Sequence, residues 1–251
     1  MADDLKKYQE ELVRSAKLAA IGEMASEISH EIQNRISGVS LWTQYLDAEL
    51  DSKDPRREYL EEMKQGLGGF MGLLEDLKQF YKTPLLHLSE VNVNDLIRAS
   101  VPMIEQRITE RRISLELLLD PDLPAVTCDG EKIKSVILNL VINAIEAVEE
   151  NGRIEIHTFS LDSGPERASR SEVKFSVRDN GCGIAEQDLA RIFYPFYSTK
   201  GSGGGLGLAM ASNIVSAHRG KIEVDSGVGE GTSFIVTLQA SDVGPEIKSE
   251  R

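Results

Sequence analysis

The 251-residue sequence is poor in cysteine, in long apolar runs and in positive charge. Its two cysteines, Cys128 and Cys182, have no metal-ligand spacing and suggest no disulfide framework, which indicates a reducing compartment. No apolar run approaches the ~18 residues of a membrane span, and the charged N-terminal stretch lacks the apolar region of a signal peptide. We therefore expect a cytoplasmic chain. Because its first residues already read as part of a helix, we expect the C-terminal, cytoplasmic part of a longer protein, one that could be membrane-bound.

Acidic residues outnumber basic ones by 41 to 28, and the formal net charge is −13. Nonspecific binding of nucleic acid needs clustered Lys and Arg, so we expect no nucleic-acid partner. A nucleotide ligand would be held through a metal ion and backbone N–H groups rather than through a basic surface. The hydrophobic share of 41% is enough for a buried core, which excludes a disordered tail.

The first third of the chain has helical periodicity. Its apolar residues recur three and four positions apart and form a heptad seam, which Arg35 interrupts. The seam comprises Leu18, Ile21, Ala25, Ile28, Ile32, Val39, Trp42 and Leu46. The stretch Asp51 to Pro55 ends this helix, and a second helical pattern runs from Arg56 to about Tyr81. Two such helices make an antiparallel hairpin. Because one hairpin cannot cover both apolar stripes, we predict a homodimeric four-helix bundle.

Beyond Pro84 the pattern changes to strands and helices. Segments such as "GRIEIHTFS", "EVKFSVRD" and "TSFIVTLQ" are rich in β-branched residues, whereas "GEKIKSVILNLVINAIEAVEE" and "GLGLAMASNIVSAH" are helical. The predicted fold class is α+β, with an N-terminal helical hairpin followed by an α/β sandwich. The predicted domains are the hairpin at 1–83, a hinge linker at 84–91, the sandwich at 92–240 and a flexible tail at 241–251.

Asp129 is the predicted N-cap of a helix that carries two asparagines, Asn139 and Asn143, one turn apart. They lie beside a predicted apolar face of Ile133, Val136, Ile137, Leu140, Val141 and Ala144. Asn is a mediocre helix former, so its presence there needs a reason. The two amides could hydrogen-bond neighbouring loops. Alternatively, the Asn143 oxygen could bind Mg²⁺, which prefers oxygen ligands, with Asn139 next to the phosphates of a nucleotide.

Two glycine-rich segments follow. In "VRDNGCGI", Asp179 ends a strand and the chain turns at Gly181 and Gly183; a carboxylate there could accept from an exocyclic amine such as that of adenine, although a turn alone explains the same letters. In "TKGSGGGLGLAM", glycines precede a helix whose N-terminal N–H groups favour phosphate. The second segment has neither the Walker nor the Rossmann spacing.

The segment "RIFYPFYSTK" lies between the two glycine-rich stretches. Phe193 and Phe196 are expected to anchor one end of a mobile lid, an expectation that differs little from ordinary packing. In the first helix, "ISHEIQN" sets His30, Glu31 and Asn34 close together. Because Ile28 lies on the seam, His30 points away from it. Taken alone, His30 is most simply a solvated helix histidine.

Taken in order, the His-containing helix, the asparagine helix, D-x-G-x-G, F-x-P-F and G-x-G-L-G-L resemble the two-component sensor histidine kinases. The resemblance runs from about Ala16 to Leu238. The catalytic domain of that family belongs to an ATPase superfamily shared with gyrase, mismatch-repair proteins and heat-shock chaperones. Those relatives lack the phosphoacceptor helix that "HEIQN" supplies here.

The resemblance implies an ATP site. Asn143 would hold Mg²⁺ and Asn139 would line the phosphate site. Asp179 would bind adenine, with Gly181 and Gly183 shaping its pocket. Thr232, in "GEGTSF", would lie near the adenine. The implied lid over the phosphates comprises Lys200, Gly203, Gly205 and Gly207.

The resemblance also implies a phosphoacceptor. His30 would attack the γ-phosphate of ATP, and Glu31 would accept the imidazole proton or orient the ring. The phosphoryl group would then pass to an aspartate of a response-regulator receiver domain. Asn34, one turn from His30, would help to place a water that hydrolyses the phosphorylated partner, so a phosphatase activity is expected as well.

The sequence departs from the family pattern in the hairpin. Where the family usually has proline after this asparagine, the chain has Arg35. The second helix carries four glycines, Gly66, Gly68, Gly69 and Gly72, opposite about Asn34 to Ser40 if the turn centres near Lys53. Our hypothesis is that these glycines supply the pliability that a proline kink supplies elsewhere. The alternative is that they let the helices approach closely.

Two other functions compete with this interpretation. One is an ATPase of the same superfamily that uses ATP for conformational work, against which the His30 hairpin argues. The other is a non-catalytic dimeric scaffold, against which Asn139, Asn143, Asp179 and the lid glycines argue.

Overall fold

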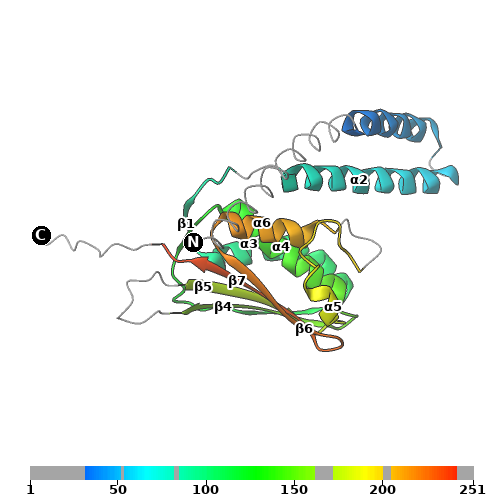
Figure 1. The fold of residues 1–251 in the computed structure, drawn as a ribbon. Helices are drawn as coiled ribbons and strands as arrows, with labels where there is room; N and C mark the ends of the chain where they lie inside the picture. Colours follow the sequence, from blue (N-terminus) through cyan, green and yellow to red (C-terminus); the bar gives the residue numbers. More distant parts are fainter. Residues whose placement is uncertain (1–31, 52–53, 82–84, 162–171, 200–204, 242–251) are drawn as a thin grey trace, which may run out of the picture. The chain divides into compact units, whose positions relative to one another are not determined.

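The computed structural model describes residues 32–51, 54–81, 85–161, 172–199 and 205–241 (Figure 1). It divides into two compact units, Met1–Pro84 and Leu85–Arg251. The first is a helical hairpin and the second a layer of helices on a sheet, which confirms the predicted α+β class. No helix among the described residues is long and apolar enough to cross a membrane.

The hairpin consists of a helix over residues 32–49 and helix α2 (Arg56–Tyr81). The first helix turns one face toward α2. That face is small or polar as well as apolar, and it includes Ile36, Ser40 and the buried Thr43. Thr43 donates its hydroxyl hydrogen to Ser40 O at 2.7 Å, so the hydroxyl is satisfied within its own helix.

Of the predicted seam, Leu18, Ile21, Ala25 and Ile28 lie outside the described residues, and Ile32 is half-buried. The other three seam residues lie on a different face from Ile36 and Ser40. Val39, Trp42 and Leu46 are 45%, 69% and 50% exposed in the single chain. A comparable stripe on α2 is also exposed. We call the two stripes together the apolar face, which comprises Val39, Trp42 and Leu46 with Tyr59, Met63 and Phe70. As predicted, the described part of one hairpin leaves large apolar side chains uncovered.

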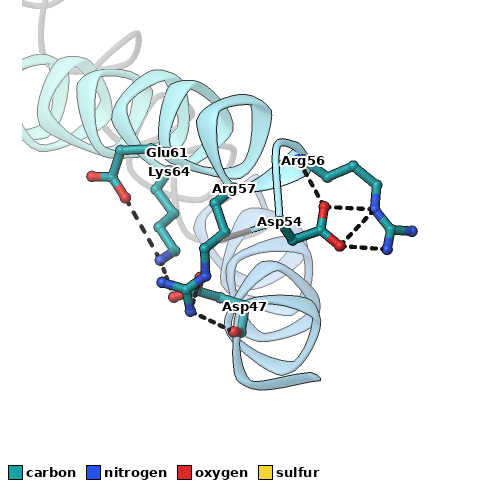
Figure 2. Close-up of polar contacts among 6 residues, drawn as sticks. All are labelled: Asp47, Asp54, Arg56, Arg57, Glu61 and Lys64. Atoms are coloured by element: carbon teal, nitrogen blue, oxygen red, sulfur yellow. Dashed lines mark hydrogen bonds and ion pairs between the residues drawn. The ribbon is translucent and has the colours of Figure 1, made fainter. Parts of the chain in front are cut away.

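Ion pairs close the hairpin near its turn (Figure 2). Asp47 accepts from Lys64 Nζ at 2.7 Å through one carboxylate oxygen and lies 3.0 Å from Arg57 Nη2 through the other. The same Arg57 atom also donates to the backbone oxygen of Asp47 at 2.9 Å. At the start of α2, Asp54 binds the guanidinium of Arg56 at 2.7 Å. One carboxylate of the first helix therefore holds two cations of the second.

The second unit contains a five-stranded sheet in the order β2-β4-β5-β7-β6 and a two-stranded sheet of β1 and β3. Strands β2 and β4 are parallel, and the other neighbours are antiparallel. The strands are β1 (Ser89–Val91), β2 (Ser114–Leu118), β3 (Val126–Cys128), β4 (Arg153–Leu161), β5 (Glu172–Asp179), β6 (Lys221–Gly227) and β7 (Gly231–Gln239). Strand β1 lies inside the stretch that we predicted as a hinge.

Helices α3 (Val93–Glu110), α4 (Gly130–Ala147) and α6 (Gly207–Ala217) cover one face of the large sheet, and a short helix, α5 (Glu186–Leu189), lies near its edge (Figure 1). Alternate residues of β5 point into the core, among them Val173, Phe175 and Val177 at 0% exposure. Because side chains alternate between the two faces of a strand, a strand with one buried and one polar face can be recognised in the sequence. The core lies between this face of the sheet and α4.

Candidate nucleotide site and phosphoacceptor helix

Helix α4 is the centre of the candidate nucleotide site. Asp129 caps its N-terminus by accepting from Lys132 N at 3.2 Å, as predicted. The predicted apolar face is confirmed, since Ile133, Val136, Ile137, Leu140, Val141 and Ala144 are all buried. Asn139 and Asn143 are half-buried and lie on a neighbouring face of the helix. The core holds one side of α4, and this leaves the side with the two amides for contacts with the glycine-rich segments.

Asp179 lies at the last position of β5 and is 4% exposed. Its Oδ1 accepts from Gly181 N at 2.8 Å. The next residue, Asn180, ends the strand by exchanging hydrogen bonds with the backbone of Arg153 on β4. Residues Asp179 to Gly181 therefore form the turn that was the alternative to an adenine contact. The turn fixes one oxygen of the Asp179 carboxylate.

The loop after Asp179 is packed tightly against the end of α4. A Cβ at Gly181 would lie 2.4 Å from Ala147 O, and Cys182 N donates to that same oxygen at 3.1 Å. Gly183 has φ +69°, and a Cβ there would lie 1.9 Å from Gly227 O. Only glycine fits at either position. The approach at Gly181 brings the loop to the end of α4, one turn beyond Asn143, and the approach at Gly183 brings it against the end of β6.

Thr232 lies directly opposite Asp179 in the β5–β7 register and is 5% exposed. Its hydroxyl is 3.0 Å from that of Ser226, which donates to Gly231 O at 2.8 Å. Ser226 also accepts from Ile184 N at 2.9 Å, just after Gly183. The structure thus joins the predicted residue Thr232 to the glycine loop through Ser226, a residue that we did not predict. A serine in a strand gives no signal by itself.

The second glycine-rich segment ends beside Asn139. Helix α6 begins at Gly207, where a Cβ would meet only Asn139 Oδ1 and Cγ, at 3.6 and 3.7 Å. Among the described residues no side chain caps this helix start. Gly205 has φ +63° and lies against the backbone of Phe196 and Tyr197. The other two predicted lid residues, Lys200 and Gly203, lie outside the described residues.

The F-x-P-F segment is held by Phe193 and not by Phe196. Phe193 packs edge-to-face against Phe234 at 6.4 Å, whereas Phe196 is 60% exposed and has φ +62°. The second anchor is instead Tyr197, whose hydroxyl donates to Asp188 Oδ1 at 2.6 Å and whose ring lies 4.6 Å from the Arg191 guanidinium. The hydrogen bond to Asp188 raises the pKa of Tyr197 above its ordinary value. Sequence reasoning missed Tyr197 because it falls just outside the motif.

The candidate phosphoacceptor residues are only partly described. His30 and Glu31 lie outside the described residues, and Asn34 is exposed on the first helix. One to two turns beyond Asn34, the two helices enclose a groove of about 340 Å³. Its lining includes Ser37, Leu41 and Gln44 of the first helix and Lys64, Leu67 and Gly68 of α2. The groove confirms that Gly68 lies at the level of Ser37 to Leu41.

The other histidines of the chain lie away from these candidates. His157 on β4 is 3.1 Å from Glu155 Oε2, and His87 contributes its backbone N–H to the Asp129 carboxylate. His218 follows the last residue of α6, and its ring accepts from Asp129 N at 2.9 Å. Both cysteines are free; Cys128 is buried and Cys182 is exposed.

Most of the second unit matches a known family of ATPases. The family model "Histidine kinase-, DNA gyrase B-, and HSP90-like ATPase" matches residues 128–242. The sensor histidine kinase ZraS of Escherichia coli is 33% identical over 92% of the chain, which spans 48% of ZraS. The chain thus spans less than half the length of this curated relative.

Solved structures agree with the sequence matches. The catalytic domain of histidine kinase ThkA is 34% identical with a TM-score of 0.54, over 61% of this chain and 96% of that domain. ThkA in complex with the response regulator TrrA is 30% identical with a TM-score of 0.65, over 95% of this chain and 67% of that one. Full-length ShkA with AMPPNP is 26% identical with a TM-score of 0.74, over 87% of this chain and 46% of that one. The chain therefore belongs to the sensor histidine kinases, and its second unit has the ATPase fold that this family shares with gyrase B and HSP90.

Proposed function

We propose that the chain phosphorylates itself on His30 with ATP and passes the phosphoryl group to an aspartate of a response-regulator receiver domain. The observation that carries the proposal is the convergence of two candidate segments on α4. Asp179 and its loop contact the Ala147 end, and the start of α6 lies beside Asn139. These segments are 30 to 70 residues apart in the sequence, so ordinary local packing does not explain their meeting.

Each part of the convergence suits one part of ATP. Asp179 has one oxygen fixed by Gly181 N, and a carboxylate has further lone pairs to accept from the adenine amine. The uncapped start of α6 offers backbone N–H groups and a positive dipole end to the phosphates. Thr232 lies beside Asp179, as a residue near the adenine would. ShkA, a relative of this chain, was solved with an ATP analogue.

We further propose Mg²⁺ as the metal ion, held by the amide oxygen of Asn143. The described residues contain no cluster of three or more acidic, histidine or cysteine side chains that could hold a metal. Mg²⁺ usually needs only one or two protein ligands when phosphates and waters complete its shell, so a single amide oxygen fits. When bound, the ion neutralises charge on the phosphates.

At the phosphoacceptor, a nitrogen of the His30 imidazole attacks the γ-phosphorus. The N–P bond forms, the bond from the γ-phosphorus to the bridging oxygen breaks, ADP leaves, and Glu31 takes the ring proton. Catalysis is mostly positioning, because phosphoryl transfer needs little covalent help from the protein. The segment 84–91 is proposed as the hinge that lets the nucleotide reach His30.

We propose that the receiver domain docks at the groove of the hairpin. By sequence spacing, His30, Asn34, Ser37, Leu41 and Gln44 follow one helical stripe, four and three residues apart. The last three line the groove, so a partner seated there lies beside the acceptor histidine. ThkA, with which the chain shares 30% identity, was solved with its response regulator. Asn34, exposed on the same stripe, is placed to orient a water for the proposed phosphatase activity.

We also propose that two copies pair through the apolar face of the hairpin, because a single chain leaves that face uncovered. The two free cysteines fit the reducing cytoplasm as the site of action.

The proposal is tested by incubation with γ-labelled ATP and Mg²⁺, followed by a gel. We expect acid-labile, base-stable label on the wild type and none on His30→Ala. His87→Ala, which removes an exposed histidine side chain of the second unit, is the matched control and should keep the label. Label on His30→Ala would show that another residue is the acceptor.

Two other outcomes favour the competing functions. ATP hydrolysis without any label would favour an ATPase that uses ATP for conformational work. Failure to bind a nucleotide analogue in the presence of Mg²⁺ would favour a scaffold that has kept only the fold. Addition of a receiver domain to the labelled protein then tests the second step, which should move the label to the receiver.

A further inference from the structure

The side chain of His218 joins the end of α6 to the start of α4. Its Nε2 lies 2.9 Å from Asp129 N, and its Nδ1 lies 2.8 Å from Ile214 O. A backbone N–H can only donate and a backbone carbonyl can only accept. In this arrangement Nδ1 carries the hydrogen and donates to Ile214 O, and Nε2 accepts from Asp129 N. One imidazole thus bridges the last turn of α6 and the N-cap residue of α4.

Asp129 is itself a junction. It is 6% exposed, and its two carboxylate oxygens accept from Lys132 N at 3.2 Å and from His87 N at 3.0 Å. Burial raises the pKa of Asp129, but the hydrogen bonds from His87 N and Lys132 N outweigh it, so this pKa lies below its ordinary value. With Oδ1, Oδ2 and the backbone N–H all engaged, Asp129 is fixed in place and can serve as an anchor for α6 through His218.

Helices α4 and α6 run antiparallel, with contacts at both ends of α6. The C-terminal end of α6 meets Asp129 through His218, and its N-terminal end meets Asn139 at Gly207. Between these points the packed residues are apolar, including Ala211 and Val215 at 0% exposure. Apolar packing is not directional. The His218 hydrogen bond is directional, and it ties the end of α6 to one point on α4, the backbone N–H of Asp129.

We propose that His218 is a positioning residue for nucleotide binding, acting through α6. It sets the position of the α6 N-terminus, and therefore of the phosphate-facing N–H groups, relative to Asn139. The inference rests on the proposed ATP site. His218 lies at the opposite end of α6 from the proposed phosphate site. It would act on that site without touching the nucleotide. A displacement of about 1 Å at reacting groups can cost on the order of a hundredfold, so a remote anchor has measurable consequences.

The test compares two replacements at one position in the full chain. His218→Gln places a side-chain oxygen near the position of Nε2 and can still accept from Asp129 N. His218→Met has similar length and offers no comparable acceptor. The dissociation constant for the Mg²⁺ complex of a nonhydrolysable ATP analogue is measured by calorimetry. The KM for ATP and the kcat of autophosphorylation are measured alongside it.

A matched control comes from a second polar network of the same unit. Thr158 is 5% exposed, donates to Asn94 Oδ1 at 2.8 Å and accepts from Asp120 N at 2.9 Å. It joins α3 to β4 and contacts none of the proposed ATP-site residues. Thr158→Val should lower the melting temperature as a lost buried hydrogen-bond network does, without moving α6.

We expect His218→Met to raise the dissociation constant and the KM for ATP about tenfold with kcat at saturation within about twofold, an order suggested by other supporting-residue changes. His218→Gln should stay within about threefold of the wild type, and Thr158→Val should leave the affinity unchanged. In ¹⁵N spectra the wild-type His218 ring should show hydrogen on Nδ1 alone.

Unchanged affinity in His218→Met would overturn the inference and leave the proposed function standing. An equal loss of affinity in Thr158→Val would also overturn it, because general destabilisation would then explain both. A wild-type chain that bound no analogue would overturn the ATP-site proposal first, and the inference with it.

Discussion

At the scale of single residues, the candidate site depends on buried side chains that hydrogen bonds from neighbouring backbone groups hold in one orientation. Asp179 is the clearest case. Its Oδ1 is engaged by Gly181 N, and its burial at 4% exposure makes any further acceptor bond strong, because water competes poorly there. A turn-forming aspartate needs only the first bond. We propose that a nucleotide base donates to the same carboxylate.

We predict that Asp179→Asn weakens nucleotide binding at least tenfold with little change in fold, an order typical of losing a hydrogen bond to a charged group. An asparagine Oδ1 can still accept from Gly181 N, so the turn survives. Its NH₂ group would face the exocyclic amine of adenine, donor against donor. Calorimetry with an ATP analogue measures the loss. A guanine nucleotide, which presents a carbonyl at that position, should lose less affinity.

The prediction fails if Asp179→Asn binds ATP as the wild type does while circular dichroism shows the same fold. Asp179 would then be a turn residue only. Loss of both binding and fold would show instead that the turn needs the Asp179 carboxylate and does not accept an amide in its place.

At the scale of elements, the glycines of α2 now have a narrower explanation. A Cβ built at Gly66, Gly68, Gly69 or Gly72 meets nothing within 4 Å among the described residues. Between the described parts of the two helices these glycines therefore allow no close approach, which was the alternative to pliability. The glycines lower the helix-forming tendency of α2, and no described part of the first helix packs into the space that they leave.

We predict that replacing all four glycines with alanine raises the melting temperature of the hairpin, because each change removes about 1 kcal/mol of helix cost and meets open space. If pliability matters, the ratio of kinase to phosphatase activity should change as well. Both activities are measured on the same preparation. A higher melting temperature with an unchanged ratio would reject the pliability hypothesis and leave only the stability effect.

Gly68 has a second consequence, since it lines the groove whereas Gly69 does not. We predict that Gly68→Leu fills part of the groove and slows transfer from phosphorylated His30 to the receiver, with autophosphorylation unchanged. Gly69→Leu is the matched control on the same helix, with the same added side chain and the same gain in helix propensity. Transfer is measured from purified labelled protein. Equal transfer rates in the two variants would show that the receiver docks elsewhere.

The ion pairs near the turn predict an acid-sensitive hairpin. The hydrogen bond from Lys64 lowers the pKa of Asp47 against the opposing effect of burial, with a further contribution from Arg57. The side-chain hydrogen bond from Arg56 lowers the pKa of Asp54 to about 2. A carboxylate whose pKa is lower in the folded state stabilises the fold above its unfolded pKa, and this stabilisation is lost as the pH falls through the folded pKa.

We therefore predict that the melting temperature of the hairpin falls between about pH 4 and pH 2, and falls less in Asp47→Asn. Asp54→Asn should remove the part of the fall nearest pH 2. Thermal melts monitored by circular dichroism at fixed ionic strength measure both. Because the side chains of both partners are partly exposed, added salt should weaken the effect in the wild type. Identical acid profiles in the wild type and both variants would refute the assignment.

At the scale of the whole molecule, the sequence predicted well the elements with a periodic apolar pattern and the turns that contain glycine. The apolar face of α4 and the alternation of β5 carry period-specific patterns that tertiary packing preserved. Gly181 and Gly183 stood out because a turn next to a strand needs them. The bridge from His218 to Asp129 could not be predicted, because it joins residues 89 positions apart and neither has a periodic signal.

The hairpin shows the same limit. The heptad seam was visible, but periodicity does not tell which apolar stripe faces the second helix of the same chain. In the structure that side is partly small and polar, with Ser40 and Thr43, whereas Val39, Trp42 and Leu46 are exposed. When a helix packs on two sides, periodicity identifies the residues of each face but does not tell which neighbouring helix each face contacts.

The exposed side of the hairpin carries the last prediction, that two copies pair through the apolar face. Trp42, Tyr59 and Phe70 are 69%, 68% and 44% exposed, and Tyr45 beside Trp42 is 59% exposed. With 150–250 Å² per aromatic side chain, these four leave roughly 500 Å² uncovered. A stable interface buries about 800 Å² per partner, so the aromatic side chains alone supply more than half of that area.

Trp42 is the single tryptophan of the chain, so its emission reports this face without a label. We predict a blue-shifted emission at high concentration that moves to the red on dilution, as water reaches the ring when the dimer dissociates. Leu46→Glu, which puts a charge on the apolar face, should give the red-shifted emission at every concentration and sediment as a monomer. Gln44→Glu adds the same carboxylate roughly half a turn around the helix, on the groove, and should still dimerise. If Leu46→Glu and Gln44→Glu behave alike in both measurements, the copies do not pair through Val39, Trp42 and Leu46, and the exposed stripe serves some other contact.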